Sequence, residues 1–173
     1  MSTLMNPAVD SIITVRRVTP EDRDFLFGLY CAARAEDFSL LALPKDQKQQ
    51  LILMQFTAQQ NAYRAQFPGS DYVIVMQNDR PVGRIWIAEM EQEFHLVDIA
   101  LLPEARNAGI GALLIRQLQT EARRAGKAVR STVFRFNSGS LRFHERLGFR
   151  ISAEDPVQYY MEWRPGDSPL VAP

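Results

Sequence analysis

The sequence has few of the features that mark a secreted, metal-binding or membrane protein. It contains one cysteine, Cys31, among 173 residues, which excludes an internal disulfide framework and a cysteine metal cage. No run approaches the roughly 20 consecutive apolar residues of a membrane-spanning helix. Its start, Met1–Asp10, lacks the basic segment and apolar core of a signal peptide. We therefore expect a cytoplasmic protein with no membrane partner and no metal.

What is present is the composition of an ordinary folded domain. Apolar residues make up 46% of the chain and charged residues 23%, and the length suits one domain with a proper core. The chain ends in a segment rich in proline and glycine. The sequence therefore predicts an N-terminal tail over 1–10, a single domain over 11–163 and a C-terminal tail over 164–173.

Positive charge is concentrated in one part of a chain whose formal net charge is zero. From Arg106 to Arg150 there are ten Lys and Arg residues against two acids, Glu121 and Glu145. Such an excess favours a ligand that carries several phosphates, although most of these side chains also fit ordinary solvated helix faces. Nucleic-acid binding is a weaker interpretation and we expect none, because the phenylalanines Phe134, Phe136, Phe143 and Phe149 have core spacing rather than that of a stacking platform.

Apolar periodicity and turn residues predict a mixed α/β fold around one central sheet. Three consecutive strands form an antiparallel meander, and a later strand–helix–strand unit requires a crossover. The predicted order is a strand over 11–18, a helix that begins with Thr19 as N-cap and Pro20 after it, an irregular segment over 36–43, a helix over 44–66, strands over 72–76, 83–90 and 93–102, a helix over 109–125, a strand over 127–134, a helix over 138–147, and strands over 149–153 and 157–163.

The segment from Arg106 to Gly111 is the most informative part of the chain. It joins an apolar strand to an amphipathic helix, so it places the unpaired N–H groups and positive dipole end of a helix N-terminus at a tight turn. Gly109 and Gly111 lack Cβ, which permits a ligand to approach the backbone, and Arg106 adds a cation. The segment therefore predicts a pyrophosphate site.

Two better-known glycine motifs do not fit this turn. A P-loop has a Lys-Ser/Thr pair after its last glycine, whereas Ala112-Leu113 follow Gly111. A dinucleotide fingerprint needs a third glycine where Leu114 stands and an acid after the next strand. A pair of glycines that opens a helix and binds no ligand stays an open alternative.

A second motif, from Asn137 to Phe149, follows one strand later. Together with the Leu-Pro-Glu turn at 101–104 and the glycine turn, it resembles the paired signatures of the GNAT N-acetyltransferase superfamily, Arg/Gln-x-x-Gly-x-Gly/Ala and Asn-x-x-Ala-x-x-Phe-Tyr-x-x-x-Gly-Phe. The resemblance covers 11–163 in element order and is specific over 98–149. The stretches 55–63 and 97–103 are similar to a bacterial subgroup whose substrate is uncertain.

The resemblance implies a central, mostly antiparallel sheet with flanking helices, in which the fourth and fifth strands form a splayed parallel pair. It implies an N-acetyltransferase with acetyl-CoA as donor and an amine as acceptor. Pantetheine would lie along the end of the fourth strand, and the pyrophosphate would meet the glycine turn. The implied cofactor-binding residues are Ala100, Leu101, Leu102, Arg106, Asn107, Ala108, Gly109, Ile110, Gly111, Ala112, Asn137, Ser140 and Phe143.

Three residues are candidates for catalysis. The attacking amine must lose a proton, and the first candidate to accept it is Asp98 and the second is His95. Their odd spacing predicts opposite faces of a regular strand. Asp98 has an alternative role as a structural carboxylate that pairs with a neighbouring strand. His144 stands where the family usually has a tyrosine, so it either protonates the departing thiolate or merely lines the pocket.

The acceptor is the least determined part of this interpretation. The first choice is the primary amine of a small molecule, and the alternatives are a peptide or protein amine and a non-catalytic module that senses acetyl-CoA. Gln59 and Tyr63 lie on one helical face and are candidates for the acceptor wall. Arg84 has no assigned role, and a homodimer stays open.

Overall fold

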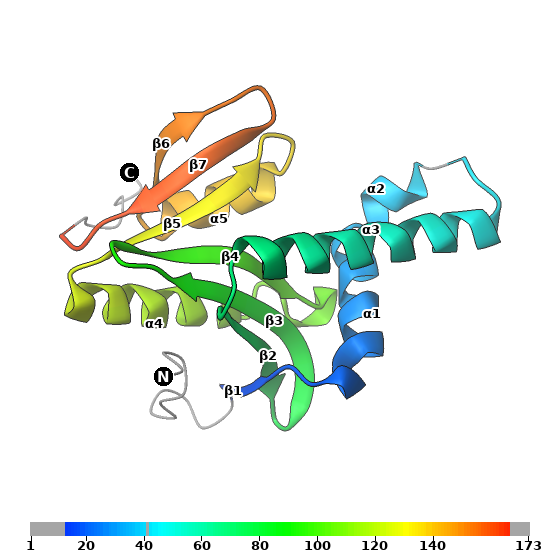
Figure 1. Ribbon diagram of the computed structural model, residues 1–173, viewed down its shortest axis with the longest axis horizontal. Coiled ribbons are helices and arrows are strands. Elements are labelled where there is room, and N and C mark those ends of the chain that lie inside the picture. The colour runs from blue at the N-terminus through cyan, green and yellow to red at the C-terminus, as the bar shows by residue number, and fades with distance from the viewer. Residues whose placement is uncertain (1–12, 41, 167–173) are drawn as a thin grey trace.

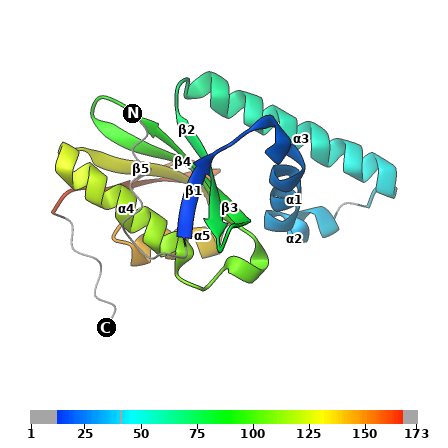
Figure 2. The same cartoon turned by 90° about the horizontal axis from the view of Figure 1, so that it is seen from below.

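The computed structural model describes residues 13–40 and 42–166, without the side chains of Glu36 and Asp37. They form a seven-stranded mixed sheet in the order β1-β2-β3-β4-β5-β7-β6, with helices on both faces (Figures 1 and 2). The strands are β1 (Ile13–Arg17), β2 (Asp71–Gln77), β3 (Arg80–Glu89), β4 (Glu93–Leu101), β5 (Ala128–Phe134), β6 (Arg150–Glu154) and β7 (Gln158–Trp163). The helices are η1 (Pro20–Asp22), α1 (Arg23–Ala33), α2 (Ala35–Ser39), α3 (Lys45–Gln66), η2 (Pro103–Ala105), α4 (Ile110–Ala125) and α5 (Ser138–Arg146).

Two apolar clusters cover the two faces of the sheet. On one face Val73 and Val75 of β2 pack in the cluster that contains α4, whose Leu114 and Leu118 are almost fully buried. On the other face Ile74 packs with α1 and α3. Because successive side chains of a strand point to opposite faces, the buried apolar centre of β2, Val73 to Val75, contributes to both layers. Burial of one large apolar side chain contributes about 1.5–3 kcal/mol.

The parallel pairing of β4 with β5 is short. It extends only from Glu93 opposite Ala128 to Leu96 opposite Ser131, whereas β5 stays paired with β7 as far as Phe134. Beyond Leu96 the two strands therefore diverge, and the second half of β4 has no strand neighbour on that side. This arrangement confirms the predicted mixed sheet with a splayed parallel pair.

An extra residue in β4 changes the direction of its side chains. Trp86 lies opposite Asp98 and Ile87 opposite Leu96, so Val97 forms a bulge. A bulge shifts the alternation of a strand by one residue. Asp98 lies opposite Trp86 and His95 opposite Ala88, and these partners are two residues apart, so both side chains share one face. The prediction that His95 and Asp98 face opposite sides is therefore wrong.

The remaining element predictions agree with the structure in type, with one exception. The segment 36–43 is not irregular throughout, because it contains most of the short helix α2, while Leu41 lies outside the described residues. Residues 11 and 12 of the predicted first strand also lie outside them. The division into a domain over 11–163 and two tails stays a prediction. No helix within 13–40 and 42–166 is long and apolar enough to cross a membrane.

A buried carboxylate fixes the entry to α1. Both terminal nitrogens of Arg16 donate to Asp22, at 2.7 and 2.6 Å, and the N–H of Thr19 donates to the same carboxylate at 2.8 Å. Thr19 is the N-cap and Pro20 follows it, as predicted, although the first turn is a 3₁₀ helix. The hydrogen bonds from Arg16 and Thr19 lower the pKa of Asp22 to about 2.

We predict that Asp22→Asn lowers the free energy of unfolding near neutral pH by about 1–2 kcal/mol, a modest loss because Arg16 is partly open to solvent. The folded-state pKa of Asp22 lies below its ordinary value, so its stabilisation is present above about pH 4 and is lost as pH falls toward 2. Urea denaturation from pH 7 to pH 2.5 should show the two proteins converging in acid. A constant difference across this range would contradict the assignment.

Candidate active site

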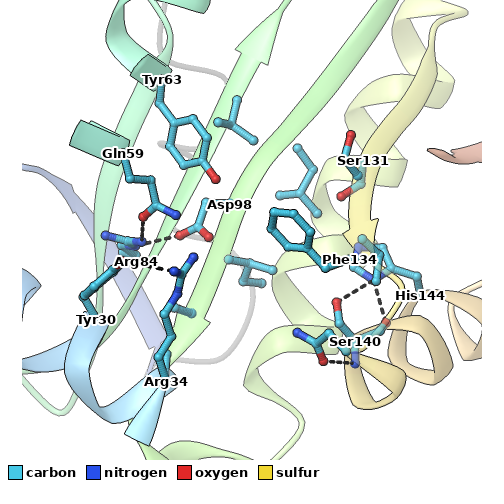
Figure 3. A pocket seen from close by; sticks show the side chains of 18 of the residues that line it. Tyr30, Arg34, Gln59, Tyr63, Arg84, Asp98, Ser131, Phe134, Ser140 and His144 are labelled. Carbon is cyan, nitrogen blue, oxygen red and sulfur yellow. Dashed lines mark hydrogen bonds and ion pairs between the residues drawn. The ribbon is translucent and has the colours of Figure 1, made fainter. Parts of the chain in front are cut away.

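A cavity of about 280 Å³ opens where β4 and β5 diverge (Figure 3). One wall comes from α1 and α3, the floor from β3 and β4, and the opposite wall from β5 and α5. Of the candidate residues predicted from the sequence, the structure places Asp98, His144, Ala100, Asn137 and Ser140 around this cavity.

The open edge of β4 presents unpaired backbone groups beside the cavity. The N–H of Leu102 donates to the carbonyl of Val82 at 2.8 Å, and hydrogen bonds from one strand point to alternate sides. The N–H groups of Leu101 and Ile99 therefore point away from β3, toward the gap before β5. These donors lie at the end of β4, along which the resemblance implies that pantetheine would bind.

Asp98 is held at the cavity by an arginine that sequence analysis left unassigned. Nε of Arg84 donates to Oδ2 of Asp98 at 2.6 Å, and the Arg84 side chain is 3% exposed against 21% for Asp98. Burial alone would lower the pKa of Arg84, but the Asp98 carboxylate and the Tyr72 hydroxyl outweigh that effect and the pKa is raised. Asp98 thus pairs with a residue of the neighbouring strand β3, as the structural alternative predicted. Its other carboxylate oxygen, Oδ1, has no hydrogen bond from Arg84.

His95 occupies a different environment from Asp98 despite the shared face. Its ring stacks on Phe67 with 4.8 Å between centroids, and its Nδ1 lies 3.5 Å from a carboxylate oxygen of Glu93. It does not line the cavity. Burial lowers the pKa of His95 despite the neighbouring Glu93. The geometry therefore favours Asp98 over His95 for contact with an acceptor.

His144 is buried on the opposite side of the cavity from Asp98 (Figure 3). Its Nδ1 lies 2.8 Å from the carbonyl oxygen of Ser140, so Nδ1 carries the proton and donates it to that oxygen. Nε2 is buried with no hydrogen-bond partner among the described residues. Burial lowers the pKa of His144, so the ring is neutral at pH 7 and Nε2 is an acceptor. A resting imidazolium acid does not fit this environment.

The glycine turn has the curled backbone of an anion-binding helix start. Asn107 and Gly109 both have positive φ, at 60° and 80°, and Gly109 is the N-cap of α4. Nε of Arg106 donates to the carbonyl of Leu101 at 2.9 Å, which fixes its guanidinium between the end of β4 and the turn. The first amides of α4 have no partner within the helix.

Gly111 has a packing role in addition to the ligand-binding role predicted from the sequence, which stays a prediction. It is buried, and a Cβ at this position would lie 3.2 Å from Cζ of Phe143. Phe143, predicted to bind the cofactor, therefore packs α5 against the start of α4. Asn137 caps α5, because its Oδ1 accepts from the N–H of Ser140 at 2.9 Å.

Two of the four phenylalanines assigned to the core are exposed. Phe134 and Phe136 are 41% and 73% exposed, and their rings stack with 5.3 Å between centroids at the edge of the cavity. Phe134 follows the alternation of β5, whose Val129, Ser131 and Val133 are buried, and so lies on the exposed face, while Phe136 lies beyond the end of the strand. The core assignment holds for Phe149, which is fully buried.

Arg34 and Tyr30 also line the cavity wall, and neither was predicted from the sequence. Arg34 is the last residue before α2, and nothing in the local pattern distinguishes it from a surface arginine. Gln59 and Tyr63, predicted from their helical spacing, do line the cavity. Within the described residues, no group of three or more His, Cys, Asp and Glu side chains could hold a metal ion.

The chain resembles known proteins both in sequence and in fold. The model of the acetyltransferase (GNAT) family matches residues 37–149, and the chain belongs to that family. Its class is therefore that of an acetyltransferase. No curated protein matches the chain.

Solved structures share the fold at low identity. PaiA N-acetyltransferase from Thermoplasma acidophilum, in complex with coenzyme A, is 17% identical with a TM-score of 0.67, over 88% of this chain and 98% of that one. YncA from Salmonella typhimurium, a putative acetyltransferase with acetyl-CoA, is 20% identical with a TM-score of 0.56, over 94% and 98%. Naa50 from Arabidopsis thaliana, with the bisubstrate analogue CoA-Ac-MVNAL, is 15% identical with a TM-score of 0.60, over 87% and 97%.

The unequal burial of Arg84 and Asp98 predicts unequal effects on stability. Asp98→Ala leaves a buried, unpaired cation and should cost about 3–5 kcal/mol. Arg84→Met removes the buried charge and leaves a carboxylate that reaches the cavity, so it should cost at least about 1 kcal/mol less. Chemical denaturation of both variants at pH 7 checks this order, and the reverse order would contradict the described pair.

Proposed function

We infer that the protein transfers the acetyl group of acetyl-CoA to the primary amine of a small molecule. The observation that carries this inference is the open edge of β4 beside a cavity that has Asp98 on its floor and His144 on one wall. A carboxylate and a neutral imidazole facing one gap can manage the protons of an amine attacking a thioester. The fold is shared with enzymes solved with coenzyme A or acetyl-CoA.

The donor binds along unpaired backbone groups at the end of β4 and at the start of α4. The amides of pantetheine pair with the exposed groups of Ile99 and Leu101, as an added strand would. The pyrophosphate meets the first amides of α4, with Arg106 beside it. This path brings the thioester to the point where β4 and β5 separate, between Asp98 and His144.

The reaction needs two proton movements. An alkylammonium has an ordinary pKa near 10.4 and must lose one proton before it attacks, and the free oxygen of Asp98 or a water beside it receives that proton. The neutral amine attacks the thioester carbonyl, forming the C–N bond and an oxyanion that the N–H of Leu101 stabilises. The C–S bond then breaks.

His144 carries the second proton. Its Nδ1 proton is committed to the Ser140 carbonyl, so Nε2 cannot donate a hydrogen bond to sulfur until it has gained a proton. Nε2 accepts the proton that the attacking nitrogen releases and delivers it to the CoA thiolate. The products are the amide and CoA thiol, and His144 returns to its neutral state.

The size and composition of the cavity favour a small acceptor over a peptide. At about 280 Å³ it is closed on one side by α1 and α3, which leaves little room for an extended chain. A peptide amine is the alternative acceptor, and a non-catalytic sensor of acetyl-CoA is the alternative function. A screen of small amines and peptides for thiol release from acetyl-CoA separates the three, and donor binding with no thiol release for any amine favours the sensor.

We predict that Ala108→Glu weakens coenzyme A binding about tenfold or more, because Ala108 is exposed in the glycine turn and a carboxylate there repels the pyrophosphate. Ala108→Gln has nearly the same size without the charge and is the matched control. Calorimetric titration measures both dissociation constants. Equal affinities for the two variants would contradict the pyrophosphate site.

For His144→Phe we expect kcat to fall about 100-fold or more, since one proton-transfer group contributes that much, with unchanged coenzyme A affinity. His144 acts in its neutral form, so the ratio of wild-type to variant kcat should shrink as pH falls through its lowered pKa. A ratio that instead grows toward acid would assign the imidazolium as the active form. An unchanged kcat would exclude the role altogether.

A further inference from the structure

We propose that the acceptor is an amine that also carries an oxyanion, a carboxylate or a phosphate, and that Arg34 binds this group. The proposal rests on the proposed acetyl transfer and names the chemical class of its second substrate. Such an acceptor is exemplified by an amino acid or an amino-alkyl phosphate.

The charged side chains that line the cavity favour an acceptor with a negative group. Its charged lining groups, among the described residues, are Arg34, Arg84 and Asp98, and His144 is neutral at pH 7. Arg84 and Asp98 neutralise each other at 2.6 Å, so Arg34 gives the cavity a net positive charge. An acceptor with several positive charges is repelled by this arrangement, whereas an anionic group is attracted.

Arg34 is held in place by Tyr30, which carries no charge. Its Nη1 donates to the hydroxyl of Tyr30 at 3.1 Å, and its guanidinium carbon lies 4.7 Å from the centroid of the same ring. Tyr30 is itself buried. No carboxylate pairs with Arg34 among the side chains that the structure describes, so the other guanidinium donors can bind an oxyanion in the forked geometry that arginine favours.

The Arg34 side chain points into the cavity that Asp98 also lines. Arg34 extends from the end of α1 toward Asp98, and the Tyr63 and Gln59 side chains lie on the far side of that carboxylate (Figure 3). An amine placed between Asp98 and His144 therefore has Arg34 on the α1 side of the same cavity. A single small molecule with its amine and its oxyanion a few bonds apart can reach both groups.

The acidic residues near the β3–β4 hairpin do not offset this charge. Glu89 pairs with Lys127 at 2.8 Å, and Glu93 pairs with Arg130 at 2.6 Å. None of the hairpin acids lines the cavity. These acidic residues therefore provide no site for a cationic acceptor in the cavity.

The test compares matched acceptors with the full chain and acetyl-CoA, by thiol release. One set pairs amino acids with their primary amides, and a second pairs phosphoethanolamine with ethanolamine. The variants are Arg34→Gln, which removes the charge, Arg34→Lys, which keeps it, and Arg64→Gln, a control on the exposed surface of α3. Ratios of kcat/KM within a pair are compared between variants at one pH, so differences in amine pKa cancel.

We expect wild type and Arg64→Gln to prefer the anionic member of at least one pair about tenfold or more. Arg34→Gln should abolish the preference, mainly through a higher KM, and Arg34→Lys should restore part of it. The pair that responds identifies the oxyanion as carboxylate or phosphate. Turnover in which Arg34→Gln keeps the wild-type ratio in both pairs overturns the proposal and leaves acetyl transfer standing. No thiol release from any amine overturns both.

Discussion

The constraint on which the site depends is the early end of pairing between β4 and β5. After four paired positions the strands separate, and the bulge at Val97 marks the same place on β4. The separation leaves the N–H groups of Ile99 and Leu101 without a strand partner, and it opens a cavity in the middle of an otherwise continuous sheet. A sheet fully paired at this point would have neither the donors nor the space for an acyl-transfer reaction.

The bulge also decides which side chains reach that space. It rotates Asp98 onto the face shared with Arg84 and Tyr72, where buried Arg84 holds it by a short hydrogen bond. A buried cation and a carboxylate at the cavity fix each other, and the cost of burying Arg84 is offset by its partner. Across the gap, the backbone carbonyl of Ser140 fixes the tautomer of His144. Asp98 and His144, the two groups proposed to move protons, are thus each oriented by a neighbour.

The sequence was sufficient for the class of fold and for most element positions, because glycine turns and apolar alternation act locally. It was insufficient where one residue changes a strand's alternation: Val97 looks like any other strand valine, yet it reverses the relation between His95 and Asp98. The role of Gly111 depends on Phe143, more than 30 positions away in the chain. Arg84 joins the cavity through its contacts with Asp98 and Tyr72, and Arg34 lines it because other elements pack around the end of α1, so no local pattern could indicate either residue.

In the proposed mechanism the open edge of β4 binds the donor through its backbone. Amide hydrogen exchange, resolved by residue with and without saturating coenzyme A, tests it most directly. We expect exchange at Ile99 and Leu101 to slow strongly on binding, while exchange at Leu102, whose N–H already donates to Val82, changes little. Saturated binding with unaltered exchange at Ile99 and Leu101 would contradict it.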